Sequence, residues 1–462
     1  MRVESDSLGE VQVPDDRYWG AQTERALRNF PGGSEKMPVE VIHAQAMIKK
    51  AVAIVNAELG LLSGEKRDRI VRAVDVILTG KLDDHFPLLI WQTGSGTQTN
   101  MNVNEVIANY ASHEEGEPLG SKRPLHPNDD VNLSQSSNDT FPTAMHIAAV
   151  LKVHDKLLPR LGVFLNDLEE KEKEFADIIK IGRTHLMDAV PLTLGHVFSG
   201  YASQIRNGMA SIRNALSHLS EIALGGTAVG TGLNTRTEYA DRVAKVLSEL
   251  TDIPLLSACN KFEALASSDA VVEMSGALKR VAGSLLKIVN DMRYAASGPR
   301  SGIGELILPA NEPGSSIMPG KVNPTQCEAL SMIVMQVFGS DVTIGFSGAS
   351  GAFELNVYRP VMIYHLLRSM DLLADGVESF RVRCLDGIRP NRLQIKEHVD
   401  RSLMLVTALN PVVGYDKAAA IAKKAYVENI TLREAALALN ALSEEEFDEA
   451  VDPAKMLGPR HR

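Results

Sequence analysis

The 462-residue sequence predicts a mainly helical protein organised around a central bundle of long helices. Over residues 271–292 apolar side chains recur at alternating steps of three and four, the spacing of a helix that packs lengthwise against its neighbours. Residues 147–168 repeat this spacing, and residues 327–338 and 361–373 are apolar on most sides. Helices of this kind need several partners, so we expect the bundle to continue between the subunits of an oligomer. A monomer whose flanking domains cover the bundle is the alternative.

Two smaller domains are expected on either side of the bundle in sequence. Residues 1–136 are predicted to form a mostly helical domain with a short N-terminal hairpin, because residues 2–13 alternate in polarity around a turn at Gly9. Shorter, alanine-rich helical segments follow the polar stretch at residues 386–394. We therefore expect a small C-terminal helical domain over residues 390–462.

The central domain is predicted to span residues 137–389 and to contain two clear apolar seams. The first consists of Ile147, Val150, Leu151, Leu158, Leu161, Leu165 and Leu168, and Pro159 is expected to kink its helix. The second consists of Val271, Met274, Leu278, Val281, Leu285, Ile288 and Met292. Both are long enough to form the core of a bundle.

Composition excludes several classes of partner. With 58 acidic and 48 basic residues the net charge is −10, so there is no general attraction for nucleic acid or an anionic membrane. No apolar run approaches the ~20 residues of a membrane span, and the N-terminus resembles neither a signal peptide nor a transit segment. We expect a cytoplasmic protein. Its cysteines, Cys259, Cys327 and Cys384, lie too far apart for a C-x-x-C site and are expected to be buried thiols, with no metal or other cofactor.

Four stretches interrupt the helical pattern with small polar residues. They are residues 93–105, 126–143, 182–196 and 314–324. Any one could be ordinary helix capping: Asn138 or Asp139 could start the helix around Pro142, and Asn323-Pro324 could be an N-cap followed by proline. Four together, with Thr184-His185 and Lys321 among them, indicate a shared binding site for a polar ligand.

Two nucleotide-binding motifs fit this ligand poorly. Gly320-Lys321 resembles part of a P-loop, but five residues separate Gly314 from Gly320, and Val322 replaces the magnesium-binding hydroxyl residue. The segment "GSGTQT" has Thr99 in place of the third glycine of a dinucleotide motif, and no strand-like run precedes it. A different anion, held without a metal, fits better.

The segment "GSSIMPGKVNPTQCEA" closely resembles the signature loop of the aspartase/fumarase superfamily. The other three polar stretches match the remaining characteristic regions of that superfamily in the same order. Gly320 before the lysine and "NKFEALASSDA" at residues 260–270 are similar to class II fumarases, since aspartases typically carry alanine before the lysine. The resemblance runs from about residue 3 to the C-terminus and shows no departure at the functional positions.

The resemblance implies a role for each motif residue. Ser315 would be the catalytic base, and His185 would pair with Glu328 around the water or leaving hydroxyl. The substrate-binding residues would be Ser95, Gly96, Thr97, Ser136, Ser137, Asn138, Thr184, Ser316, Lys321 and Asn323. A peripheral dicarboxylate site would contain His126, Pro127, Asn128 and Asp129.

The resemblance also implies a three-domain fold, a homotetramer with a central helix bundle, and active sites built from three subunits. The implied activity is that of a fumarate hydratase, a lyase that interconverts (S)-malate with fumarate and water in the tricarboxylic acid cycle. Removing a proton beside a carboxylate gives a dianionic aci-carboxylate, which preorganised donors such as Lys321 and Asn323 could stabilise by roughly 3 kcal/mol each. Ser315 needs activation, because a free serine hydroxyl is hardly ever ionised near neutral pH.

Three alternatives differ in chemistry or class. A sister lyase would release ammonia from aspartate. An iron–sulfur hydratase would need the three cysteines to hold a cluster, and their spacing argues against it. A non-catalytic helical assembly would have no use for the complete set of Ser315, Lys321, Asn323, His185 and Glu328.

Overall fold

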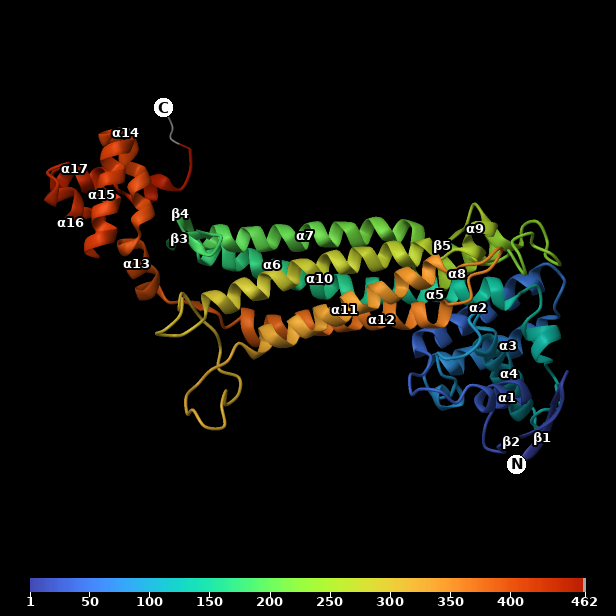
Figure 1. The fold of residues 1–462 in the computed structure, drawn as a ribbon. Helices are drawn as coiled ribbons and strands as arrows, with labels where there is room; N and C mark the ends of the chain where they lie inside the picture. Colours follow the sequence, from blue (N-terminus) through green and yellow to red (C-terminus); the bar gives the residue numbers. More distant parts are fainter. Residues whose placement is uncertain (460–462) are drawn as a thin grey trace. The chain divides into compact units, whose positions relative to one another are not determined.

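The structure, a computed structural model, describes residues 1–459 and is mainly helical (Figure 1). Within these residues the helices are α1 (Ala21–Asn29), α2 (Val39–Glu58), α3 (Gly64–Leu78), α4 (Thr97–Glu114), α5 (Ser137–Lys152), α6 (Leu158–Glu174), α7 (Leu194–Leu219), α8 (Tyr239–Thr251), α9 (Lys261–Ala266), α10 (Asp269–Ala295), α11 (Thr325–Ala349), α12 (Arg359–Phe380), α13 (Arg392–Arg401), α14 (Asn410–Val413), α15 (Tyr415–Glu428), α16 (Leu432–Ala438) and α17 (Glu444–Ala450). The predicted mainly helical class is confirmed.

The strands form four two-stranded sheets in the described chain. They are β1 (Arg2–Asp6) with β2 (Gly9–Val13), β3 (Ile179–Thr184) with β4 (Met187–Thr193), β5 (Glu221–Ile222) with β6 (Leu256–Ser257), and β7 (Leu306–Ile307) with β8 (Arg389–Pro390). The β5–β6 pair is parallel and the other three pairs are antiparallel. Sheets this small contribute local structure and leave the core to the helices.

The chain divides into two compact units. The first contains Met1–Pro159, Gly208–Ala282 and Met335–Ala374. The second contains Arg160–Asn207, Gly283–Val334 and the described residues from Asp375 onward. Helices α7, α10, α11 and α12 contribute residues to both units.

The predicted seam on α10 is confirmed. All seven of its apolar residues are at most 1% exposed. The earlier seam is buried at Ile147, Val150, Leu161 and Leu168, while its other members are partly buried. Near the predicted kink a π-helical turn at Val153–Leu157 joins α5 to α6, and it ends just before Pro159. A π turn accommodates a local change in helix geometry at little cost in hydrogen bonds.

The N-terminal hairpin is also confirmed, with Asp6 paired to Gly9. Its turn residues are Ser7 and Leu8, and Gly9 opens β2 with a φ of +113°. The second hairpin, β3–β4, has no counterpart among the predicted elements. Its two turn residues, His185 and Leu186, both have positive φ, as in the mirror-image turns that favour glycine or asparagine. The sequence therefore lacks the usual turn signal.

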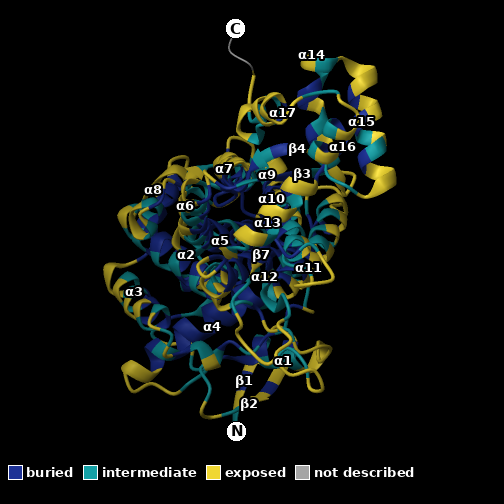
Figure 2. Cartoon of the chain, turned by 90° about the vertical axis from the view of Figure 1, so that its left-hand side faces the viewer, coloured by how far each residue is buried: buried dark blue, intermediate teal, exposed yellow. Residues whose placement is uncertain are grey.

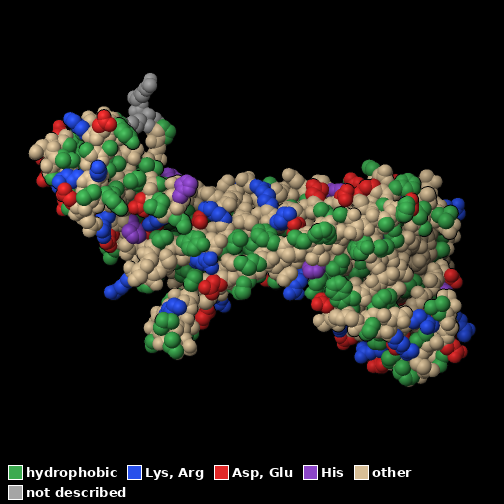
Figure 3. Space-filling model, in the orientation of Figure 1, with side chains coloured by type: hydrophobic (Ala, Val, Ile, Leu, Met, Phe, Trp, Pro, Cys, Tyr) green, Lys and Arg blue, Asp and Glu red, His purple; other side chains and the backbone are tan. Residues whose placement is uncertain are grey.

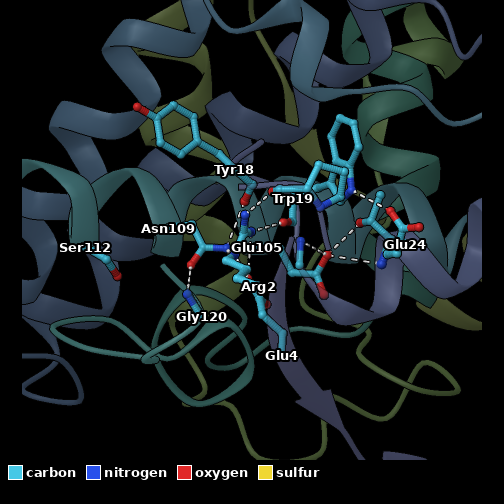
Figure 4. A network of polar contacts seen from close by, with 12 residues as sticks. Arg2, Glu4, Tyr18, Trp19, Glu24, Glu105, Asn109, Ser112 and Gly120 are labelled. Atoms are coloured by element: carbon cyan, nitrogen blue, oxygen red, sulfur yellow. Dashed lines mark hydrogen bonds and ion pairs between the residues drawn. The ribbon is translucent and has the colours of Figure 1, made fainter. Parts of the chain in front are cut away.

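Helix α4 is largely buried (Figure 2), and it is an unusual part of the first unit's core because many of its buried side chains are polar. Asn109, for example, donates from Nδ2 to the carbonyl of Tyr18 at 2.9 Å and accepts from the amide of Gly120 at 2.8 Å (Figure 4). Helix α2 is buried along most of its length and packs against α3, α5 and α8. Polar side chains inside a helical core must satisfy one another, which fixes the relative positions of the segments that carry them.

Helix α11 differs from the expectation that no apolar stretch approaches the length of a membrane span. An 18-residue window of this helix has a mean hydropathy of 1.5, so it is long and apolar enough to cross a membrane by length and composition alone. Only 33% of that window is buried, and exposed side chains on it include Met332, Met335, Val342 and Phe346. Hydrophobic side chains are visible at the surface along the long helices in Figure 3. A single such helix is weak evidence for a membrane span, since bundle helices share this composition.

The C-terminal helices surround a small apolar core in the second unit. Helices α15 and α16 confirm the predicted alanine-rich helical segments. The core contains Ile181, Val399, Leu405, Leu409, Ala418, Ile421, Ala425, Leu432, Ala435, Ala436 and Phe447. Ile181 belongs to β3, so this core also holds the base of the β3–β4 hairpin.

Candidate active site

Two of the four polar stretches meet in the first unit. Thr97 Oγ1 lies 2.8 Å from Ser95 Oγ and 2.7 Å from Ser137 Oγ. Thr97 is the first residue of α4 and Ser137 is the first residue of α5, so the N-termini of two helices meet at these hydroxyls. Helix N-termini present unpaired backbone amides and a partial positive charge, both of which favour an anion.

Two glycines explain why the first stretch reads "GSG". A Cβ atom on Gly94 would lie 1.3 Å from the carbonyl oxygen of Val357. Gly96 is the N-cap of α4 with a φ of +77°, and a Cβ there would lie 2.2 Å from the ring of Phe141. Gly94 thus permits the close approach of Val357, and Gly96 permits a left-handed helix start against Phe141.

The second stretch begins α5 with a capping box. Ser136 is the N-cap, and its hydroxyl accepts a hydrogen bond from the amide of Asn138 at 3.1 Å. Asp139 accepts from the Ser136 amide at 3.0 Å. Ser136 is therefore the N-cap in place of Asn138 or Asp139, Asp139 completes the capping box, and Pro142 lies inside α5. A serine N-cap with an acidic residue three positions later is a common helix start.

Asp139 is fully buried and also holds a distant loop. Its Oδ2 accepts from the amides of Gly225 at 3.0 Å and Thr227 at 2.8 Å, while Asn138 donates from Nδ2 to the carbonyl of Ala228 at 2.9 Å. Burial raises the pKa of Asp139 to about 6, although its three backbone hydrogen bonds and the charge of Lys49 oppose this shift. The loop thus lies against the first residues of α5.

Lys49 on α2 connects the two stretches through hydrogen bonds to residues of both. Its Nζ donates to the side-chain oxygens of Asn100 at 2.6 Å, Asn132 at 3.0 Å and Gln135 at 2.8 Å. Burial lowers the pKa of Lys49 to about 7, and the charge of Asp139 opposes this shift. Sequence reasoning missed Lys49, although Gln45, Lys49 and Asn56 mark a polar row on one face of a largely apolar helix.

Arg359 is a second buried cation that sequence reasoning missed. Its Nη1 donates to the carbonyl of Asn138 at 2.8 Å and its Nη2 to that of Leu265 at 2.6 Å. The amide of Arg359 donates to the carbonyl of Gly94 at 3.1 Å. Burial lowers the pKa of Arg359 to about 10, so the guanidinium is charged at neutral pH. Its only sequence signal is an Arg-Pro pair at the start of an apolar helical run.

The third stretch forms the β3–β4 hairpin of the second unit. Thr184 is the last residue of β3, and His185 is the first residue of the turn. Both side chains are exposed. Below them Arg183 Nη2 pairs with the buried carboxylate of Glu305 at 2.8 Å, and Lys180 Nζ approaches the same carboxylate at 3.1 Å. These ion pairs fix the strand that carries Thr184 and His185.

The fourth stretch, the 314–324 loop, is stabilised by its own polar contacts. The amide of Gly314 donates to the carbonyl of Lys321 at 3.0 Å, and Asn323 Nδ2 donates to the carbonyl of Gly314. Ser315 Oγ accepts from the amides of Ile317 at 3.3 Å and Met318 at 3.0 Å. The loop is followed directly by α11, whose first helical residue is Thr325.

The remaining polar residues of this region are solvent-facing. Ser316, Lys321 and Glu328 are exposed, and Glu328 lies in the first turn of α11. Across residues 1–459 no hydrogen bond or ion pair joins His185 to Glu328 or to Ser315. A single chain therefore assembles the 95–97 and 136–138 residues, but it does not assemble the implied catalytic set.

The peripheral segment forms a compact turn in the first unit. His126 Nδ1 accepts from the amides of Asn128 at 3.2 Å and Asp129 at 3.1 Å, and Pro127 begins a π-helical turn. His126, Pro127 and Asn128 line a cavity of about 310 Å³ together with Glu105. Asp129 is exposed.

The cysteines correct one further expectation. Cys327 and Cys384 are buried thiols as expected, but Cys259 is exposed. Within the described residues, no group of three or more histidine, cysteine or acidic side chains is arranged to hold a metal ion.

Two family comparisons cover most of the chain. Residues 9–339 match the Lyase family, and residues 405–458 match the family described as the fumarase C C-terminus. A protein named fumarate hydratase class II from Thermosynechococcus vestitus is 61% identical over 459 residues, which are 99% of this chain and 98% of that relative. A protein of the same name from Helicobacter pylori is 56% identical over 460 residues, covering 100% and 99%.

Solved structures agree with this similarity. The crystal structure of recombinant class II fumarase from Schistosoma mansoni superposes with a TM-score of 0.97 at 45% identity, covering all of both chains. The crystal structure of a fumarate lyase:delta crystallin from Brucella melitensis bound to cobalt has a TM-score of 0.96 at 42% identity, covering 99% of this chain and 100% of that one.

Proposed function

Because the chain belongs to the class II fumarate hydratase family, we propose that it catalyses the reversible hydration of fumarate to (S)-malate in the tricarboxylic acid cycle. The observation that carries this proposal is similarity over the full chain, to relatives of one name, that includes all four polar stretches. The substrate is a small dicarboxylate, which suits the paired helix N-termini at Thr97 and Ser137.

The reaction places its greatest demand on charge stabilisation. Proton removal from malate creates an aci-carboxylate with a second negative charge on oxygens that are already anionic. Donors aimed at that charge lower the barrier by roughly 3 kcal/mol each. Lys321 and Asn323 on the 314–324 loop, with Ser95, Gly96, Thr97, Ser136, Ser137, Asn138, Thr184 and Ser316, are the groups that we assign to the substrate.

Ser315 is the base in this proposal. Its oxygen already accepts two backbone hydrogen bonds, from Ile317 and Met318. Donors of this kind stabilise an alkoxide more than a hydroxyl, and therefore favour loss of the serine proton. The neighbouring Lys321 is tied to the same loop through its carbonyl and adds positive charge.

His185 and Glu328 handle the water or departing hydroxyl in this proposal. Within the described residues of one chain no hydrogen bond or ion pair joins them, which supports an arrangement in which they meet between subunits. The exposed apolar face of α11, with Met332, Met335 and Phe346 more than half exposed, supports such an assembly. We therefore propose a cytoplasmic homotetramer of three-domain subunits, with active sites shared between chains and the segment from His126 to Asp129 as a peripheral dicarboxylate site.

The test of the activity is the ultraviolet absorbance of fumarate mixed with purified, chelator-treated protein. We expect the signal to decay to an equilibrium rich in malate, and a parallel tube with aspartate to release no ammonia. Ammonia from aspartate with a constant fumarate signal would assign the chain to a sister lyase. No change in either tube would favour a non-catalytic assembly.

Two variants test the assigned roles once activity is established. Ser315→Ala is expected to lower turnover at least about a hundredfold with the oligomer intact, as for loss of a general base. Near-normal turnover would remove Ser315 from that role. His185→Asn is expected to lower the rate in both directions, and unchanged rates would remove His185 from the handling of water.

A further inference from the structure

Buried positive charge lies directly beneath the Thr97–Ser137 hydroxyl pair. Lys49 is 1% exposed and donates to Asn100 and Gln135, which lie just outside the 95–97 and 136–138 segments. Arg359 is fully buried and donates to the carbonyl of Asn138. Within residues 1–459, Asp139 is the buried carboxylate whose charge acts on both cations. Two cations facing one anion leave a net positive charge inside this part of the core.

The position of Lys49 follows from helix geometry. Its partner Asn100 is three residues after Thr97 on α4, and Thr140 is three residues after Ser137 on α5. Thr140 Oγ1 donates to Asn100 Oδ1 at 3.2 Å, so the two helices remain in contact at this level. A rise of 1.5 Å per residue places this level about 4.5 Å below the hydroxyl pair. The Lys49 ammonium is therefore about one helical turn from the proposed substrate site.

The hydrogen-bond partners of Lys49 carry no charge, and Asp139 acts on it without forming an ion pair. All three acceptors, on Asn100, Asn132 and Gln135, are neutral amide oxygens, and within the described chain Lys49 forms no ion pair. Burying an ammonium without a counter-ion costs several kcal/mol, and an apolar side chain on α2 would avoid that cost. A buried charge that weakens folding is explained if it stabilises a bound ligand of opposite charge. A dicarboxylate substrate would supply that negative charge.

We propose that Lys49 is a positioning residue that strengthens dicarboxylate binding without touching the substrate, by holding a positive charge beneath the Thr97–Ser137 pair. This inference rests on the proposed function, because it needs a dicarboxylate at that pair. Lys49 acts on the site in two ways, through the electric field of its charge and through its hydrogen bonds. It donates to the side-chain oxygens of Asn132 and Gln135, which fixes the chain immediately before Ser136.

The charge of Lys49 should depend on pH near neutrality. Among the elements packed against α2, helix α4 presents the neutral Asn100 and also carries the buried Glu105, and helix α5 presents Asp139. Helix α8 carries the buried Tyr239, whereas Asp75 on α3 is paired with Lys50. Since burial lowers the pKa of Lys49 to about 7, the free enzyme loses this proton as the pH rises past that value. A bound dianion favours the charged form, so binding takes up a proton and the affinity falls at higher pH.

The experiment is calorimetric titration of the full-length protein with succinate, a saturated four-carbon dicarboxylate that cannot be hydrated. Measurements in two buffers of different ionisation enthalpy at about pH 7.5 give the number of protons taken up on binding. We expect uptake by the wild type and an affinity about tenfold lower at about pH 9 than at about pH 6. No proton uptake by the wild type would overturn the proposal without any variant.

Three variants identify the titrating group. Lys49→Arg keeps a permanent charge, so it should bind succinate without the Lys49 component of proton uptake. Lys49→Met should bind succinate about tenfold more weakly at pH 6, and its affinity should lose most of the dependence on pH. Lys50→Met is the matched control on the same helix, since Lys50 is paired with Asp75 on the outer side, and should behave as the wild type. Wild-type uptake that persists in Lys49→Met would overturn the assignment.

The outcomes also separate this inference from the proposed function. If the wild type hydrates fumarate but succinate binding shows no Lys49-dependent proton uptake, only the role of Lys49 fails. If the wild type neither hydrates fumarate nor binds succinate, the proposed function fails and the role of Lys49 fails with it.

Discussion

Lys49 and Glu105 are two buried charges of the first unit that solve the same problem in different ways. Each is served by neutral hydrogen-bond partners. Glu105 accepts at Oε2 from the amides of Gly20 at 2.9 Å and Thr23 at 3.2 Å and from Thr23 Oγ1 at 2.6 Å, and at Oε1 from the amide of Gln22 at 2.8 Å (Figure 4). Lys49 instead faces side-chain amides.

The two charges differ in the part of the molecule that supplies their hydrogen-bond partners. Gly20, the N-cap of α1, has no side chain to cap the helix, and Glu105 on α4 supplies the missing acceptor from another segment. The donors to Glu105 are thus the fixed backbone amides of a helix start. The partners of Lys49 precede or follow the proposed substrate residues. Loss of Glu105 should therefore reduce stability, whereas loss of Lys49 should reduce binding.

The largest effect that would sharpen this comparison is expected from Glu105→Gln. The amide group would place a donor against the donors of Gly20 and Thr23, and each buried donor left unsatisfied costs about 1–3 kcal/mol. We expect the free energy of unfolding in urea to fall by about 3 kcal/mol, with succinate affinity unchanged in the folded protein. Glu114→Gln, at an exposed position on the same helix, is the control. Weaker succinate binding with normal stability would reverse the comparison.

A somewhat smaller effect is expected from Gly20→Ala. A Cβ atom at this position would lie 2.6 Å from Glu4 Oε2 and 2.9 Å from Glu105 Cδ, so both carboxylates would have to move. Overpacking of this kind costs about 2 kcal/mol. Gly64→Ala at the start of α3 is the matched control, because its nearest neighbour is an ordinary 3.7 Å contact with Arg67. Equal unfolding midpoints for the two variants would show that Glu105 does not need its present position.

A pair of threonines compares the two networks directly. Thr23→Val removes a hydrogen bond to the Glu105 carboxylate, and we expect a loss of about 1.5 kcal/mol because the acceptor is charged. Thr140→Val removes a 3.2 Å bond to the neutral amide of Asn100 and should cost about 0.5 kcal/mol, while weakening succinate binding. Urea unfolding and calorimetry measure both quantities. The comparison would break if Thr23→Val were the variant with weaker binding.

The same contrast explains what could be predicted from sequence. The α10 seam was predictable because its burial repeats with the helical period along one segment. Ser95–Thr97 and Ser136–Asn138 could be identified as polar stretches, and their contact at Thr97 and Ser137 follows from the start of two helices. The β3–β4 hairpin was not predictable, since His185 and Leu186 occupy a turn that usually contains glycine or asparagine.

The buried charges were harder to predict because their partners are distant in sequence. Lys49 is 51 residues from Asn100 and 86 from Gln135. A lysine on an apolar helix face has no local signal that separates a buried network from a solvent-facing side chain. The proposed pairing of His185 with Glu328 is harder still to predict, because no hydrogen bond or ion pair joins them within the described residues.

The pH dependence of stability that comes from Glu105 tests the same comparison without a large change at any single pH. Burial raises the pKa of its carboxyl to about 7 from a value of 4.5, although four hydrogen bonds oppose the shift. Between these two values the unfolded chain has released this proton and the folded chain still holds it, so stability falls as the pH rises and becomes level above about 7. The wild type should therefore lose about 1 kcal/mol per pH unit relative to Glu105→Gln within this window. Urea unfolding of both proteins at several pH values measures the difference. A gap that is constant with pH would mean that the four donors hold Glu105 ionised throughout, and Lys49 would then be the only one of the two charges that titrates near neutral pH.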